Sequence, residues 1–190
     1  MAWRNDQVSE LETEKIVSLA RECLNVPGDF VEMGCYKGDT SLLLAEVLEG
    51  ADKQLYIYDS FEGLPSGREE DGGASDSGFV AGALSVTKRE VKARFLRAGM
   101  KVPVIKKAWF NELTEADLPE EISFAFLDGD LYESIRDSLN LICGKMNRAG
   151  IIVVHDYNNP VLPGVARAVD EWLKEHPHKT SIYQSMIVLS

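Results

Sequence analysis

Two aspartates directly follow an apolar run in the stretch "ISFAFLDGDLYES", residues 122–134. The run is typical of a buried strand, and Asp128 and Asp130 stand at its end with one glycine between them. Two carboxylates held together repel each other unless a cation or a proton lies between them. The pair therefore predicts a site that binds a cation or a proton. The plainer alternatives are a solvated acidic rim and, for Asp130, an N-cap of the next helix.

A second polar group, His155-Asp156, follows the apolar run "IIVV" at 151–154. If the two runs are neighbouring strands, their ends lie about 5 Å apart. Asp128, His155 and Asp156 would then converge on one point. A hard divalent ion such as Mg²⁺ takes such oxygen ligands and keeps other positions for water or substrate oxygens.

A glycine-rich turn, "EMGCYKGDTS" at 32–41, follows another apolar run. Gly34 and Gly38 allow a tight turn and a close approach of the backbone to a ligand. The helix N-terminus behind them, with Thr40 and Ser41, suits a carboxylate or a phosphate. The alternative is that the glycines serve only the turn. The spacing is not G-x-G-x-x-G, which disfavours a dinucleotide and a nicotinamide-dependent oxidoreductase.

An acid, Asp59, ends the next apolar run, about twenty residues beyond the glycines. In sheets of parallel strands, an acid at this position binds the ribose hydroxyls of an adenosine. The alternative is a turn-forming aspartate. Trp109 follows a later run and is interpreted either as a wall of an adenine pocket or as core packing.

The elements that must position these residues alternate between strands and helices. Expected strands cover 29–34, 54–59, 101–109, 121–128 and 151–156, with one or two more in 180–190. Expected helices cover 39–50, 88–99, 131–150 and 165–177, besides an N-terminal helix within 1–27 whose capping box is Ser9 and Glu12. This order predicts a three-layer α/β fold with a mostly parallel sheet, in which ligands bind beyond the carboxyl ends of the strands.

One segment, residues 62–78, is rich in glycine, serine and acids and interrupts the alternation. It is either a mobile connection or part of a lid over a ligand, and we place the predicted lid at 62–85.

The composition limits the partners. The 190 residues suggest one domain, 1–190, and the net charge of −11 disfavours nucleic acid and anionic membranes. Three cysteines without C-x-x-C spacing predict free thiols and a cytoplasmic protein. The first residues are too polar for a signal peptide, and no apolar run is long enough to span a membrane.

Four stretches together resemble the macrocin O-methyltransferase (TylF-like) family: "DFVEMGCYKGDTS", "LYIYDSFEGLP", "FAFLDGDLYESIRDSL" and "GIIVVHDYNNPVLPGVARAVDEW". The resemblance spans roughly 28 to 173. It implies a class I S-adenosylmethionine-dependent methyltransferase fold with seven strands, the last one antiparallel. It also implies an enzyme that uses Mg²⁺ to methylate a hydroxyl on a sugar or glycosylated small molecule.

The resemblance also implies roles for individual residues. Glu32, Gly34 and Gly38 would line the methionine part of the cofactor, and Asp59 would bind its ribose. Asp128 would bind the metal with His155 and Asp156, and Asp130 would be the general base. The predicted cofactor site further includes Tyr36, Thr40, Ser41, Ser60, Trp109 and Asp128.

Two departures from the family pattern bear on these roles. The family usually has Asp-Asp-Tyr where this chain has His155-Asp156-Tyr157. An imidazole favours Mn²⁺, Fe²⁺ or Zn²⁺, or lets His155 act as a base without metal. Family members often carry a longer N-terminal region, so the acceptor and the assembly, for which we consider a homodimer, stay open. A module that binds S-adenosylmethionine without chemistry is the other class of function considered.

Overall fold

The computed structural model describes residues 7–190. Residues 1–6 of the N-terminal segment 1–27, within which a helix is predicted, lie outside the described residues. The described residues form five α-helices, which are α1 (Glu10–Glu22), α2 (Asp39–Val47), α3 (Lys88–Ala98), α4 (Tyr132–Ile142) and α5 (Pro163–Glu175). They also form seven strands, which are β1 (Asp29–Met33), β2 (Leu55–Asp59), β3 (Val104–Lys107), β4 (Ile122–Leu127), β5 (Met146–Val154), β6 (Thr180–Tyr183) and β7 (Met186–Leu189). Short 3₁₀ turns connect several of them.

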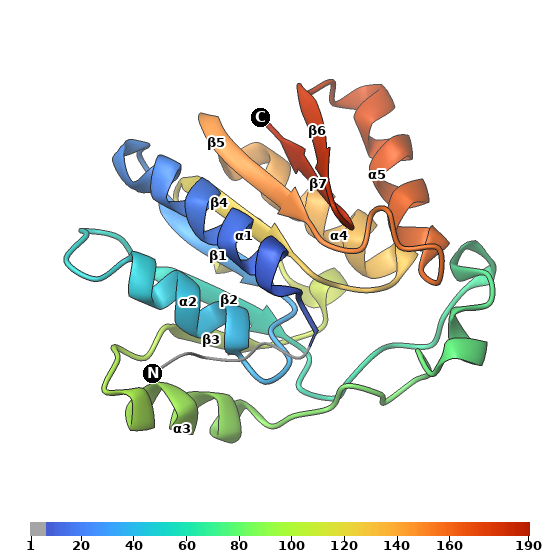
Figure 1. Cartoon of the computed structure of the whole chain (residues 1–190), viewed down its shortest axis with the longest axis horizontal. Coiled ribbons are helices and arrows are strands. Elements are labelled where there is room, and N and C mark those ends of the chain that lie inside the picture. Colours follow the sequence, from blue (N-terminus) through green and yellow to red (C-terminus); the bar gives the residue numbers. More distant parts are fainter. Residues whose placement is uncertain (1–6) are drawn as a thin grey trace.

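The strands form one sheet in the order β3-β2-β1-β4-β5-β7-β6 (Figure 1). Strands β1 to β5 pair in parallel, whereas β7 runs antiparallel to β5. The predicted α/β class with an antiparallel last strand is confirmed. Strands β2 and β3 lie on one side of β1, whereas β4 and β5 lie on its other side. The strand order therefore reverses between β1 and β4. That is the position where such sheets bind ligands.

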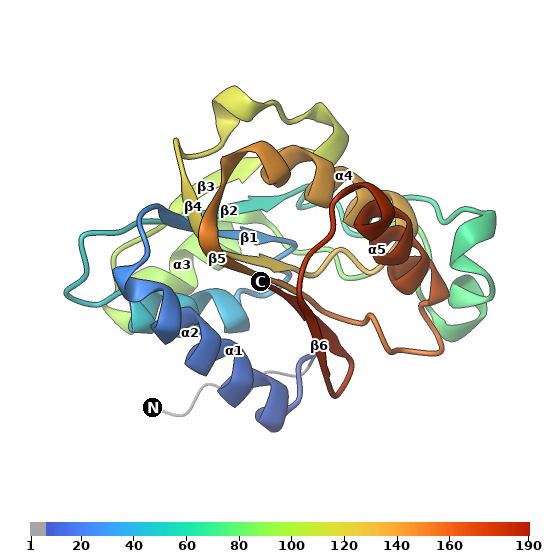
Figure 2. The same ribbon diagram turned by 90° about the horizontal axis from the view of Figure 1, so that it is seen from above.

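Helices cover both faces of the sheet, which makes the fold three layers thick (Figure 2). One core cluster joins side chains of α1, α2 and α3 to one face, and it includes Ile16, Leu42, Val91 and Phe124. The other joins α4 and α5 to the opposite face, and it includes Ile135, Val169, Ala125 and Leu127. All six residues of β4 are buried because the strand is covered on both sides.

The first helix begins as its sequence predicts. Ser9 is the N-cap of α1, and its side chain and that of Glu12 exchange hydrogen bonds with each other's backbone N–H groups. This reciprocal arrangement satisfies donors that the first helical turn leaves open. The same arrangement at Thr87 and Glu90 starts α3.

The predicted helix 131–150 is wrong beyond residue 145. Helix α4 ends at Ile142, a 3₁₀ turn covers Cys143–Lys145, and residues 146–150 form the first half of β5. Gly144 lowers helix propensity by about 1 kcal/mol relative to alanine. The side chain of Asn147 also accepts a hydrogen bond from the N–H of Ala149 at 2.8 Å, which competes with helical bonding.

Candidate active site

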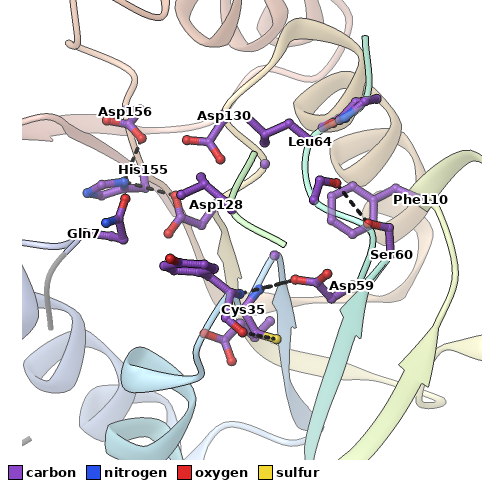
Figure 3. A pocket seen from close by; sticks show the side chains of 18 of the residues that line it. Gln7, Cys35, Asp59, Ser60, Leu64, Phe110, Asp128, Asp130, His155 and Asp156 are labelled. Atoms are coloured by element: carbon purple, nitrogen blue, oxygen red, sulfur yellow. Dashed lines mark hydrogen bonds and ion pairs between the residues drawn. The ribbon is translucent and has the colours of Figure 1, made fainter. Parts of the chain in front are cut away.

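A cavity of about 600 Å³ lies at the carboxyl ends of β1, β2, β4 and β5, a size usual for small-molecule sites (Figure 3). Its walls include most of the residues that the sequence predicts for a site, namely Glu32, Gly34, Tyr36, Thr40, Asp59, Ser60, Trp109, Asp128, Asp130, His155 and Asp156. Gly38 and Ser41 do not line it. Gly38 is instead the N-cap of α2, in the left-handed conformation at φ 80°.

The turn after β1 requires glycine at its first position. Gly34 has φ +88°, and a Cβ atom there would lie 2.1 Å from the carbonyl oxygen of Asp128. The N–H of Asp128 in turn donates to the carbonyl of Met33 at 2.9 Å. This close approach brings the glycine turn and the acids after β4 into one wall of the cavity.

Asp59 holds two turns together. Its Oδ2 accepts hydrogen bonds from the N–H groups of Cys35 at 2.9 Å and Tyr36 at 3.3 Å, and its Oδ1 accepts one from Phe61 at 2.6 Å. Asp59 thus has the turn-forming role that was the alternative for it, while still lining the cavity. Its role in ribose binding stays a prediction.

Glu32 is fully buried in β1, and the hydroxyl of Ser41 donates to its Oε2. Among residues 7–190, no group forms a hydrogen bond with Oε1, which lies at the cavity wall. Burial raises the pKa of Glu32, the hydrogen bond from Ser41 lowers it, and the charges of Asp128 and Asp59 raise it, which together bring that pKa to about 8. A cation with an N–H group that enters the cavity would give Oε1 a hydrogen-bond partner and favour the ionised form of Glu32.

The residues after β4 and β5 converge as predicted from their spacing. His155 Nδ1 lies 3.1 Å from Asp128 Oδ1 and 3.0 Å from Asp156 Oδ2. Figure 3 shows the imidazole between these two carboxylates and Gln7. Burial lowers the pKa of His155, but the charge of Asp128 and the bonds to both carboxylates outweigh it and hold that pKa well above its ordinary value.

The same three side chains have the spacing of a metal site, because their ligand atoms all lie within 4.8 Å of one another. Octahedral Mg²⁺ with bonds of about 2.1 Å places adjacent donors about 3 Å apart, close to the distances around Nδ1. The donor set therefore fits a divalent ion, and its imidazole nitrogen favours Mn²⁺, Fe²⁺ or Zn²⁺ over Mg²⁺. Use of a metal stays a prediction.

Asp130 does not cap the helix that follows it. The N-cap of α4 is Leu131, without a side-chain cap, and the N–H of Tyr132 donates to Asp71 Oδ1 at 2.7 Å. Burial raises the pKa of Asp130 well above its ordinary value, and the charges of Asp128 and Asp156 raise it further. Asp130 also has φ 60°, an uncommon conformation for a residue with a side chain. The cap alternative is wrong, and the base role stays a prediction.

The segment predicted as a lid reaches the cavity. Leu64, Pro65, Phe79 and Leu84 line it. The segment contains two 3₁₀ turns, Glu69–Asp71 and Ala74–Ser77, and the buried Asp71 binds it to the start of α4. Whether the lid moves stays a prediction.

Some lining residues have no signal in the sequence that identifies them. Gln7 and Val8 come from the segment before α1, and Phe110 and Asn111 from a turn after β3. Their placement depends on how α1 and the loops pack, which no local pattern encodes. Among residues 7–190, no helix combines the length and apolar character needed to cross a membrane.

Comparisons with known proteins agree with this architecture. A family model described as macrocin O-methyltransferase (TylF) matches residues 10–186. The chain is 31% identical over 157 residues to demethyldecarbamoylnovobiocin O-methyltransferase of Streptomyces niveus, covering 78% of this chain and 59% of that protein. It is 30% identical over 141 residues to 8-demethyl-8-(2,3-dimethoxy-alpha-L-rhamnosyl)-tetracenomycin-C 4'-O-methyltransferase of Streptomyces olivaceus, covering 70% and 54%.

Among solved structures, the O-methyltransferase NovP superimposes with a TM-score of 0.78 and 25% identity, covering 92% of this chain and 78% of that one. The calicheamicin methyltransferase CalS11 also gives 0.78, at 20% identity, covering 98% and 80%. With the sheet order described above, these matches define a class I methyltransferase fold. The family model matches nearly the whole chain, so the chain belongs to the macrocin O-methyltransferase (TylF) family. The chain covers 59% and 54% of the lengths of the two Streptomyces relatives.

Proposed function

We propose that the protein is an S-adenosylmethionine-dependent O-methyltransferase that acts on a hydroxyl of a sugar or glycosylated small molecule. Membership of the family supports the reaction, and the names of the two Streptomyces relatives, both O-methyltransferases, support the acceptor class. The observation that carries the proposal is that one cavity contains Glu32 and Asp59, suited to the cofactor, together with Asp130, suited to proton removal.

S-adenosylmethionine would supply a methyl group already activated on a sulfonium. Its ammonium group matches the free Oε1 of buried Glu32, and its ribose hydroxyls match the carboxylate of Asp59. The glycine at 34 keeps this wall free of a side chain. These groups would fix the donor, and positioning accounts for much of the rate in such transfers.

Asp130 is the base in this proposal. Its raised pKa makes it a stronger proton acceptor than an exposed carboxylate. His155 is less suited as a base in the absence of metal, because the effect of burial on its pKa is outweighed by the charge of Asp128 and the bonds to Asp128 and Asp156, which raise that pKa and favour the protonated imidazole. A divalent ion would bind Nδ1 only by displacing the proton on that nitrogen. A divalent ion on Asp128, His155 and Asp156 would act as a Lewis acid on the acceptor hydroxyl.

The remaining expectations are also proposals. The free thiols Cys23, Cys35 and Cys143 are consistent with a cytoplasmic location, and a homodimer stays a prediction. Titration calorimetry with S-adenosylmethionine tests the cofactor assignment. Saturable binding that weakens in Glu32→Gln and Asp59→Asn is expected, and no binding by a folded protein would contradict the proposal.

A further inference from the structure

A buried carboxylate on α1, Glu12, is held from two directions. Its Oε2 accepts hydrogen bonds from the N–H and hydroxyl of Ser9, at 3.1 and 2.6 Å. Its Oε1 accepts bonds from the N–H of Ser185 at 3.0 Å and from the Ser185 hydroxyl, in the turn between β6 and β7. Glu12 is only 5% exposed, so the carboxylate is fixed and shielded from water.

The same carboxylate faces the site. His155 Nε2 lies 3.8 Å from Glu12 Oε2, and this nitrogen forms no hydrogen bond within residues 7–190. The other ring nitrogen, Nδ1, lies between Asp128 and Asp156. The imidazole, 5% exposed, is therefore enclosed by carboxylates at both nitrogens.

We propose that Glu12 is a positioning residue for His155: its fixed carboxylate, 3.8 Å from Nε2, attracts the N–H of that nitrogen and thereby favours the ring orientation in which Nδ1 faces Asp128 and Asp156. A histidine whose second nitrogen faces a carboxylate is fixed in ring orientation and tautomer. The contact between Glu12 and His155 does not depend on the proposed function. Only its consequence, that Nδ1 faces the reaction site, rests on that function.

The purely structural alternative is that Glu12 joins α1 to the β6–β7 turn. The bonds to Ser9 and Ser185 would suffice for that, and they do not depend on the residue at 155. The two roles differ in one respect. With an imidazole at 155, the buried charge of Glu12 is favourable, whereas an aspartate there would place a further carboxylate beside it. Glu12 and His155 are therefore expected to be matched in charge.

A double-mutant cycle tests this matching. Urea unfolding is measured with EDTA present and without cofactor or acceptor, so the result is independent of methyl transfer. Glu12→Gln is expected to lower the unfolding midpoint of the wild-type protein and to raise it in the His155→Asp background. Ser185→Ala, which removes a bond to the other oxygen of Glu12, is the matched control. It is expected to lower the midpoint equally in both backgrounds.

A spectroscopic measurement gives a second readout. The long-range ¹⁵N–¹H spectrum contains only three histidines, and His155→Asp identifies the signals of His155. The chemical shifts of the His155 ring nitrogens are expected to change in Glu12→Gln and to stay the same in Ser185→Ala. In Glu12→Asp they are expected to change by an intermediate amount. If Glu12→Gln lowers the midpoint equally in both backgrounds, or leaves the His155 signals unmoved, the inference is overturned and Glu12 only anchors α1. If Glu12→Gln fails to fold in the wild-type background, the double variant Glu12→Gln/His155→Asp decides: a folded double variant supports the matching of the two residues, and failure of both to fold overturns it.

Discussion

At the scale of single residues, the acids of the cavity differ in what neutralises them. Asp39 pairs with Arg94, and Asp59 accepts three backbone N–H groups. Within residues 7–190, neither Asp130 nor Glu32 has an ion pair or a backbone N–H donor, although the Ser41 hydroxyl donates to Glu32, and burial raises the pKa of each. Such perturbed groups in a cleft are candidates for chemistry or for binding a cation.

Replacing Asp130 with Asn tests its role as base. The amide keeps the shape but cannot accept the proton, so turnover is expected to fall by about 10²- to 10⁴-fold. Affinity for S-adenosylmethionine in calorimetry is expected to stay the same. Asp52→Asn, an exposed residue at the opposite end of the sheet, is the control. Turnover at the wild-type rate in Asp130→Asn would remove Asp130 from the mechanism.

Glu32 predicts a specific pH dependence of stability. Its pKa is about 8 in the folded protein against an ordinary value of 4.5 for an unfolded chain, so the folded state holds the proton more tightly. This contribution is complete below pH 4.5 and is lost as the pH rises toward 8. Glu32→Gln is expected to remove that decline, an effect on the order of a few kcal/mol at pH 8. Urea unfolding at pH 5, 6.5 and 8 measures it, and parallel curves for both proteins would contradict it.

At the scale of elements, the turn after β1 depends on a glycine for two separable reasons. Gly34 and Gly50 both have positive φ. A Cβ added at Gly34 would lie 2.1 Å from a backbone oxygen, whereas one added at Gly50 would have no non-neighbouring atom within 4 Å. Gly50→Ala is expected to cost about 1–2 kcal/mol of strain. Gly34→Ala is expected to cost about 1–3 kcal/mol more. Equal unfolding midpoints for the two variants would show that the contact with Asp128 is unimportant.

The lid depends on one buried carboxylate. Asp71 accepts bonds from the N–H groups of Arg68 and Tyr132, both at 2.7 Å, and a Cβ on Gly164 would meet it at 2.2 Å. It thus fastens the lid at the N-termini of α4 and α5. Asp71→Asn is expected to cost about 1–3 kcal/mol and to speed hydrogen exchange in residues 62–85. Asp76→Asn, exposed in the same segment, is the control, and unchanged exchange in Asp71→Asn would contradict this role.

The elements also show what the sequence can predict. Apolar runs and turn signals located β1 to β4 and the second half of β5, and placed one or two strands where β6 and β7 lie. The polar residues at strand ends indicated Asp59, Asp128 and His155 as residues that line the cavity. Local patterns failed at 146–150, where pairing with β4 competes with helix formation. They also failed for Glu12 and Asp71, because contacts across 143 and 61 residues depend on tertiary packing.

At the scale of the whole molecule, the order of the strands decides where the chemistry lies. Strands β1 and β4 are neighbours although residues 34–121, nearly half of the chain, separate them. The residues after β1 and β2, which we propose bind the cofactor, and the acidic residues after β4 and β5 therefore share one cavity. With a net charge of −11, the chain suits a cationic methyl donor and a small acceptor better than a polyanion.

Transfer of a deuterated methyl group tests the central claim most directly. The protein is incubated with S-adenosylmethionine labelled in its methyl group and a panel of glycosylated and phenolic acceptors, with and without divalent metals, and products are identified by mass and NMR. We expect an O–CD₃ ether on a sugar hydroxyl, formed by the wild-type protein and lost in Asp130→Asn. Tight binding of S-adenosylmethionine with no transfer to any acceptor would contradict the account and indicate a binding module.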